Sequence, residues 1–257
     1  MKGKSVAPQV LPEIPAIVLA AGKGTRMAAP EPKAAVQVGG RPMVVRVVSA
    51  MREGGASRVI VVVGHRADDV RAALGQHVDY VVQEEQLGTG HAVRCAEPLL
   101  AGFSGTVLVG YADIPLLRRH DIARLIADHL ASGASATMLT AMFDHPGSLG
   151  RIVRAPDRRV LAIVEARDAT PEQLAIREIN VGVYAFQSPL LFELLAQIKN
   201  DNMQRQYYLT DTIGLLVSRG ERVGAVAIEV AHAGMGVDTA EDLARAQQLW
   251  ALERGLS

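Results

Sequence analysis

The segment Leu19–Lys33 reads Leu-Ala-Ala-Gly-Lys-Gly-Thr-Arg-Met-Ala-Ala-Pro-Glu-Pro-Lys and follows the apolar run Ile-Pro-Ala-Ile-Val at 14–18. Glycines let backbone N–H groups approach an anion closely. Arg26 adds a planar fork of donors and Lys33 a point charge, both suited to phosphate oxygens. The segment predicts a strand followed by a phosphate-binding loop, although Gly22 and Gly24 alone are also typical of an ordinary strand-to-helix turn.

Two familiar phosphate-binding templates do not fit this segment. A Walker loop requires glycine where Ile17 stands, and Ser or Thr where Gly24 follows Lys23. A Rossmann dinucleotide fingerprint requires a third glycine where Met27 stands. The expected phosphate site is therefore of a different kind.

Length and composition limit the class of protein. A chain of 257 residues can form one large α/β domain. Its 27 basic and 27 acidic residues balance, so we expect no nucleic-acid surface. The single cysteine excludes an internal disulfide, and the longest apolar runs are too short for a membrane span. We expect a cytoplasmic protein that binds no membrane, with a flexible tail at 1–13 and a single domain at 14–257.

Apolar runs alternate with stretches of helical spacing along the chain. The expected strands are Ala16–Ala20, Val59–Val63, Tyr80–Val82, Thr106–Val109, Ala136–Ala141, Gly182–Phe186 and Val223–Ile228. The expected helices are Met43–Glu53, Ala67–Leu74, Thr89–Ala101, Asp121–His129, Pro189–Ile198, Thr210–Ser218 and Thr239–Leu256. This alternation predicts an α/β fold with a mainly parallel sheet covered on both faces, and a ligand site at the carboxyl ends of its strands.

A second glycine cluster, at 83–91, reads Gln-Glu-Glu-Gln-Leu-Gly-Thr-Gly-His and follows the expected strand ending at Val82. The Gln83 amide offers one donor and one acceptor, which matches a uracil edge in one orientation and a cytosine edge after a flip. A surface glutamine at a helix start is an equally simple interpretation. His91 either lines the same pocket or is an ordinary helix-turn histidine.

Two aspartates are candidate metal ligands. Asp113 follows the buried strand that begins at Thr106, and hard cations such as Mg²⁺ take oxygen ligands. Asp238 precedes the last expected helix, where it could complete the metal site. The alternatives are a turn-capping role for Asp113 and a helix N-cap for Asp238.

Several further motifs occur in one order with these, and together they resemble the uridylyltransferase domain of bacterial N-acetylglucosamine-1-phosphate uridylyltransferases. The resemblance extends from about Ile14 to about Leu249. It is carried by the opening loop with Pro32-Lys33, Gln83 with the run at 86–92, Gly150-Arg151-Ile152-Val153, Ile163-Val164-Glu165, Asp168-Ala169-Thr170, Glu178-Ile179-Asn180 and Tyr207-Tyr208-Leu209-Thr210-Asp211.

The resemblance implies a Rossmann-like, mixed but mostly parallel sheet of the nucleotide-diphospho-sugar transferase fold. It implies a nucleotide-binding part at about 14–120, a sugar-binding part at about 121–235 and a C-terminal helix after Asp238. By the resemblance, uridine contacts Leu19, Ala20, Ala21, Gly22, Gln83, Gly88 and Thr89, and the sugar contacts Tyr111, Gly150, Glu165, Asn180, Tyr208 and Thr210. Arg26 binds the β- and γ-phosphates and Lys33 the α-phosphate with the sugar phosphate, while Asp113 and Asp238 ligate Mg²⁺.

The implied reaction joins UTP and a hexosamine-1-phosphate, giving a UDP-sugar and pyrophosphate. The neighbouring alternatives are a sugar nucleotidylyltransferase for dTTP, CTP, GTP or glucose-1-phosphate, and a non-catalytic nucleotide sensor. The family usually has glycine at Ala112, whose methyl would be strained at positive φ, and asparagine at Asp238. No hexapeptide repeats of an acetyltransferase β-helix occur in the chain, so we expect no acetyltransferase activity, and a monomer or small homo-oligomer.

Overall fold

A computed structural model describes residues 12–24, 26–27, 31–229 and 236–255 of the chain. The flexible tail expected at 1–13 lies almost entirely outside these residues. In the described parts of the chain, every helix is too short or too polar to cross a lipid bilayer.

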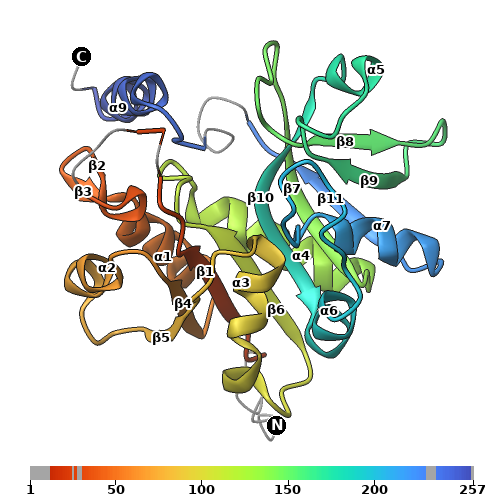
Figure 1. Cartoon of the computed structure of the whole chain (residues 1–257), viewed down its shortest axis with the longest axis horizontal. Coiled ribbons are helices and arrows are strands. Elements are labelled where there is room, and N and C mark those ends of the chain that lie inside the picture. Colours follow the sequence, from red (N-terminus) through yellow and green to blue (C-terminus); the bar gives the residue numbers. More distant parts are fainter. Residues whose placement is uncertain (1–11, 25, 28–30, 230–235, 256–257) are drawn as a thin grey trace, which may run out of the picture.

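The central sheet is mixed and mostly parallel, as the sequence predicts (Figure 1). Its main path runs β11 (Val223–Ala227), β7 (Ala136–Met142), β10 (Glu178–Gln187), β6 (Thr106–Tyr111), β1 (Pro15–Ala20), β4 (Arg58–Val63) and β5 (Asp79–Val82). Within this path only β10 is antiparallel to its neighbours, β6 and β7. The carboxyl ends of the other six strands therefore lie at one edge of the sheet.

Helices cover both faces of this sheet. One face is packed by α1 (Met43–Glu53), α2 (Ala67–Leu74) and α4 (Arg119–Ser132), and the other by α3 (Thr89–Cys95), α6 (Ser188–Leu195) and α7 (Asp211–Ser218). Two peripheral groups lie on opposite sides of the carboxyl edge (Figure 1). One is α9 (Ala240–Glu253) with the hairpin β2 (Gln37–Val38) and β3 (Arg41–Pro42), and the other is β8 (Arg151–Arg154), β9 (Val160–Val164) and α5 (Pro171–Leu174).

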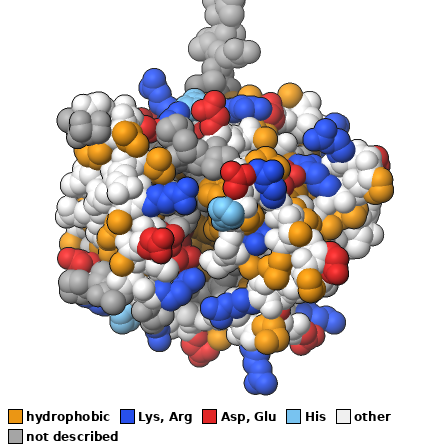
Figure 2. Space-filling view, turned by 90° about the horizontal axis from the view of Figure 1, so that it is seen from above, with side chains coloured by type: hydrophobic (Ala, Val, Ile, Leu, Met, Phe, Trp, Pro, Cys, Tyr) orange, Lys and Arg blue, Asp and Glu red, His pale blue; other side chains and the backbone are white. Residues whose placement is uncertain are grey.

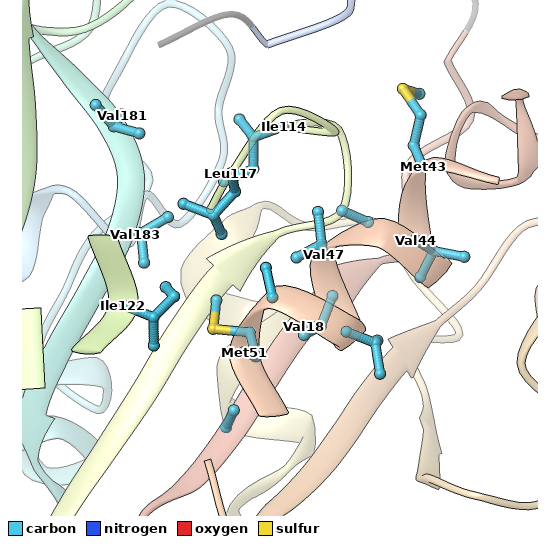
Figure 3. Close-up of a cluster of buried hydrophobic side chains, with 14 of the residues drawn as sticks. Val18, Met43, Val44, Val47, Met51, Ile114, Leu117, Ile122, Val181 and Val183 are labelled. Carbon is cyan, nitrogen blue, oxygen red and sulfur yellow. The ribbon is translucent and has the colours of Figure 1, made fainter. Parts of the chain in front are cut away.

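The core between α1, α4 and the sheet fixes the strand that leads into the glycine-rich loop (Figure 3). Val18 of β1 and Val47 and Met51 of α1 have no exposed surface, and Ile122 of α4 is equally buried. Burying an aliphatic side chain of this size stabilises the fold by roughly 1.5–3 kcal/mol. The end of β1, where the loop begins, is thus held by packing rather than by the loop itself.

Three expectations about the elements are corrected. The helix expected over Thr89–Ala101 ends at Cys95 and is followed by a short 3₁₀ turn at Glu97–Leu100, because Pro98 cannot continue an α-helix. The strand expected to begin at Gly182 begins at Glu178 and carries a bulge between Asn180 and Tyr184. The strands β2, β3, β8 and β9 and the short helix α5 were not predicted.

Candidate active site

The sequence-predicted site residues converge on one cavity of about 390 Å³ at the carboxyl edge of the sheet. This is the face shown in Figure 2, which is hollowed near its middle and has basic and acidic side chains around the hollow. All predicted residues except Tyr208 and Thr210 line the cavity. They are Leu19, Ala20, Ala21, Gly22, Arg26, Lys33, Gln83, Gly88, Thr89, Tyr111, Asp113, Gly150, Glu165, Asn180 and Asp238.

The glycine-rich loop brings Arg26 and Lys33 to the same side of this cavity. Gly24 has a φ of +63°, and a Cβ added there would lie 2.5 Å from Cβ of Lys33. A side chain at this position would therefore displace the lysine. The Arg26 guanidinium lies 2.8 Å from a carboxylate oxygen of Asp238 and is half exposed. The loop thus presents one buried and one accessible cation.

The Lys33 ammonium lies between the two predicted metal ligands. Its Nζ donates to Oδ2 of Asp113 and, at 2.5 Å, to Oδ1 of Asp238. Burial by itself would lower the pKa of Lys33, but the charges and hydrogen bonds of the two aspartates outweigh it and raise the pKa. Lys33 is therefore fully protonated at neutral pH, and three charged groups form one cluster.

Asp238 does not cap the last helix, so that interpretation is wrong. The N-cap of α9 is Thr239, whose hydroxyl accepts from the backbone N–H of Asp242, while the Asp242 carboxylate accepts from the N–H of Thr239. This reciprocal capping box leaves the Asp238 carboxylate available to the cavity. The backbone of Asp113 is tied to the same segment, since its carbonyl accepts from the N–H of Val237 at 2.8 Å.

The two carboxylates fit a hard divalent cation. They come from different segments and converge on one position, which Lys33 Nζ occupies. Within the described ranges, no group of three or more His, Cys, Asp or Glu side chains could form a complete metal cage. Two carboxylates with the remaining positions left to water and phosphate oxygens is the arrangement typical of Mg²⁺ at nucleotide sites.

The second glycine cluster places Gln83 and Thr89 on the adjacent wall. Gln83 is almost fully buried, and its Nε2 lies 3.0 Å from the carbonyl oxygen of Gly88 and 3.0 Å from Nδ1 of His91. The Thr89 hydroxyl accepts from the backbone N–H of Leu209 at 2.9 Å. This wall is therefore anchored to the segment that leads into α7.

The bulge in β10 turns Asn180 toward the cavity. Asn180 Oδ1 accepts from the N–H of Gly182 at 3.1 Å, and its Nδ2 donates to the hydroxyl of the fully buried Tyr184 at 2.6 Å. Bulges commonly re-aim a side chain in this way. Gly150 is attached to the same strand, since its carbonyl accepts from the N–H of Asn180 at 2.9 Å.

The carboxylate of Glu165 and the phenol of Tyr111 complete the cavity wall. Thr210, itself buried, donates its hydroxyl to Oε1 of Glu165 at 3.0 Å, so it supports the cavity from behind. Burial raises the pKa of Glu165, although the Thr210 hydrogen bond acts in the opposite direction. Burial and then the charge of Glu165 raise the pKa of Tyr111, which keeps it a neutral phenol. Tyr208 also lies behind the wall, where its hydroxyl accepts from Gln204 at 2.8 Å.

The methyl group of Ala112 is accommodated without backbone strain. In the described part of the chain, positive φ outside glycine occurs only at Arg66, Arg158 and Arg205. Ala112 is buried, and its N–H donates to the carbonyl of Leu19 at 3.0 Å. Alanine is thus compatible with the loop that carries Asp113.

Several cavity residues were not predicted from the sequence. They are Ala34, Gln86, Ala92, Ala112, Ile114, Ser148, Leu149, Ala166, Arg167, Val181, Gln204, Gln206 and Gly236. Most lie within two positions of a predicted residue, so extending each motif by two positions would have found them. Gln204 and Gln206 lie in an irregular segment before α7, and no local pattern distinguishes them from surface glutamines. Tyr184 lies on β10 four residues after Asn180, and the sequence predicted it only as part of a buried strand.

Comparison with known proteins gives a consistent result. A family model described as a MobA-like NTP transferase domain matches residues 16–208. The protein called bifunctional protein GlmU is 47% identical over 238 residues in Syntrophotalea carbinolica, covering 92% of this chain and 51% of that protein. The Exiguobacterium sibiricum protein of the same name is 45% identical over 232 residues, covering 90% and 52%. The chain therefore spans about half the length of the curated relatives it matches.

A solved structure supports the expected fold class. The structure titled UDP-glucose pyrophosphorylase complexed with UDP-glucose superposes with a TM-score of 0.74 and covers 94% of this chain and 100% of its own. The two sequences are 18% identical, so the likeness concerns the fold alone. The nucleotide-diphospho-sugar transferase fold expected from the sequence is confirmed.

Proposed function

We propose that this chain, which belongs to the family of MobA-like NTP transferase domains, forms UDP-N-acetylglucosamine and pyrophosphate from UTP and N-acetylglucosamine-1-phosphate. The observation that carries the proposal is the cluster of Arg26, Lys33, Asp113 and Asp238 at one end of a cavity that Gln83 and Asn180 also line. Cations and metal-binding carboxylates suit a triphosphate, and the amides suit a base and a sugar. The identity to GlmU proteins supports the choice of substrates.

We assign the nucleotide to the part of the cavity lined by residues from Leu19 to Ile114 and the sugar phosphate to the part lined by residues from Ser148 to Gln206. A sugar-phosphate oxygen attacks the α-phosphorus of UTP, an O–P bond forms, and the bond to the β-phosphate breaks with its electron pair leaving on pyrophosphate. The second pKa of a phosphate monoester is near ~6, so the nucleophile is already ionised at neutral pH and needs no general base. The obstacle is repulsion between two anions.

The chain's own residues lower this repulsion and align the reactants. Lys33 offsets charge on the α-phosphate and the sugar phosphate, and Arg26 stabilises the departing pyrophosphate. Asp113 and Asp238 would hold Mg²⁺, which supplies further charge neutralisation on phosphate oxygens. Glu165, supported by Thr210, accepts from sugar hydroxyls, and Asn180 both donates and accepts.

A pyrophosphate-release assay tests the proposal. Wild-type protein with Mg²⁺ is given each of UTP, dTTP, CTP and GTP with N-acetylglucosamine-1-phosphate or glucose-1-phosphate. We expect UTP with N-acetylglucosamine-1-phosphate to give the highest kcat/KM, and activity to disappear with EDTA. A higher kcat/KM for another pair would mean that the chain forms the corresponding sugar nucleotide instead. The absence of turnover with every pair would refute the proposal that the chain is a nucleotidyltransferase.

A further inference from the structure

We infer that His91 acts as a specificity-determining positioning residue, fixing the Gln83 amide so that it accepts a hydrogen bond from the nucleotide base. The inference rests on the proposed function, because it concerns the base that the same cavity selects. It goes further by saying which of the two amide orientations the protein imposes, and by which neighbour.

The contacts around Gln83 determine the orientation of its amide. The carbonyl oxygen of Gly88 can only accept, so the amide atom 3.0 Å from it must be the nitrogen. The same nitrogen lies 3.0 Å from Nδ1 of His91. This ring nitrogen must therefore accept, which places the proton of a neutral His91 on Nε2. Both amide hydrogens of Gln83 are then engaged within the protein.

The carbonyl end of the amide is left for a ligand. Gln83 lines the cavity, and in the part of the chain that the structure describes no donor bonds its Oε1. The fully buried side-chain atoms that have no partner are His129 Nε2 and Trp250 Nε1 among the described residues. Gln83 Oε1 is not one of them, so it has exposed surface and is open to the cavity. A flip of the amide would set Oε1 against the Gly88 carbonyl, which can only accept, and would require His91 to move its proton from Nε2 to Nδ1.

The backbone that holds this arrangement is itself fixed. The N–H of Tyr207 donates to the carbonyl of Leu87 at 2.8 Å, and the carbonyl of Tyr207 accepts from the N–H of Gly90 at 2.8 Å. The glycine turn between them therefore cannot easily rotate the Gly88 carbonyl away. His91 follows within the first turn of α3, so its ring is carried by a regular element.

An amide locked in this way discriminates between pyrimidines. Uracil and thymine present an N3–H, which can donate to Oε1, whereas N3 of cytosine is an acceptor and would face the lone pairs of the same oxygen. A site built to accept a hydrogen bond rejects a base that cannot donate one. His91 thus contributes to selection of UTP over CTP without touching the base.

The test compares two substitutions that keep the branching of the side chain at Cγ. His91→Leu removes the acceptor, while His91→Asn keeps an acceptor, Oδ1, in the place of Nδ1. Calorimetric titration with UTP, CTP and dTTP in the presence of Mg²⁺ and without sugar phosphate gives the binding preference independently of turnover. Thermal unfolding of each variant shows that it is folded.

We expect the wild-type protein to bind UTP at least ~10-fold more tightly than CTP, and His91→Leu to reduce that ratio by roughly 10-fold, about the value of one hydrogen bond. His91→Asn should retain the ratio, and the ratio of UTP to dTTP should stay the same in all three proteins, because thymine carries the same N3–H. An unchanged UTP-to-CTP ratio in His91→Leu, an equal loss in His91→Asn, or no preference in the wild type would overturn the inference. Binding of UTP with the expected ratios but without pyrophosphate release would refute the proposed reaction alone.

Discussion

Lys33 lies between two carboxylates that would otherwise repel each other, and this contact leads to the first prediction. Lys33→Met should lower turnover at least ~100-fold, the usual effect of removing an electrostatic stabiliser from a reacting group. Without the ammonium, Mg²⁺ should take its place between Asp113 and Asp238. We therefore expect Mg²⁺ to raise the Tm of the variant more than that of the wild type, measured by thermal unfolding with EDTA and with Mg²⁺.

Lys199→Met is the matched control for this change, because Lys199 is exposed and does not line the cavity. It should keep wild-type turnover and the wild-type response to Mg²⁺. Equal stabilisation of wild type and Lys33→Met by Mg²⁺ would show that the ammonium and the cation do not share a position.

Tyr184 supports the proposed sugar pocket from within the core. Tyr184→Phe removes the hydroxyl that accepts from Asn180 Nδ2 at 2.6 Å. We expect a loss of about 1 kcal/mol in the free energy of unfolding and a KM for sugar phosphate raised by roughly 5-fold, with the KM for UTP unchanged. Tyr80→Phe is the control, since the Tyr80 hydroxyl donates to the Gly75 carbonyl at the surface. Equal effects on the two KM values would argue against a role confined to the sugar.

At the scale of elements, the bulge in β10 depends on Gly182. This residue has a φ of +84°, and a Cβ added there would lie 2.5 Å from Cδ2 of Tyr111. Gly220 has a φ of +75° with open space around it, so Gly220→Ala carries the backbone cost alone, about 1–2 kcal/mol. Gly182→Ala should cost roughly 1–3 kcal/mol more because of the overlap, and should raise the KM for sugar phosphate.

Urea unfolding of the two glycine variants measures this difference directly. The two substitutions change the same kind of backbone conformation, so their difference isolates the contact with Tyr111. If Gly182→Ala were no less stable than Gly220→Ala, the close approach of β10 and Tyr111 would not be required for the fold.

The sequence predicts those elements whose signals are local. Apolar runs identify all seven strands of the main path, and the carboxyl ends of parallel strands share an edge, so Gly22, Gln83 and Asp113 could be placed together. The bulge at Asn180 could not be predicted, because it depends on the register between β10 and β7. The N-cap at Thr239 was predictable: the capping box with Asp242 distinguishes it from Asp238.

At the scale of the whole molecule, the cavity exists only because distant segments meet. Leu209 donates to Thr89, Val237 to the carbonyl of Asp113, and Gly39 to Gln247 of α9. Sequence order alone indicated which motifs belong together, but not that Thr210 supports Glu165 from behind or that Lys33 lies between the aspartates. Those details depend on contacts between segments that are far apart in the sequence.

The stability of the whole fold should depend on a buried histidine that does not line the cavity. His129 of α4 is 1% exposed; its Nδ1 lies 3.0 Å from the Thr137 hydroxyl, and its buried Nε2 has no partner among the described residues. Burial lowers the pKa of His129. The unfolded chain therefore takes up a proton at this histidine as the pH falls through ~6.5, whereas the folded protein does so only at lower pH. The free energy of unfolding must then decrease as the pH drops below ~6.5.

Asp211 has the opposite effect on the free energy of unfolding as the pH falls. Burial, and then the charge of Asp168, raises the pKa of Asp211 to about 6. The folded protein therefore takes up a proton at Asp211 before the unfolded chain does, and this contribution to stability grows as the pH falls below 6. A net pH profile mixes the two effects, so the histidine must be isolated by substitution.

Urea unfolding of the wild type and of His129→Gln at pH ~7.5 and ~5.5 isolates the contribution of His129 to stability. One histidine changes the free energy of unfolding by at most ~1.4 kcal/mol per pH unit. We expect the wild type to lose about 1 kcal/mol more than His129→Gln over this interval, although the variant is less stable at both pH values. His145→Gln, at an exposed position, should follow the wild type. An equal acid-induced loss in the wild type and in His129→Gln would show that protonation of the buried imidazole does not limit stability.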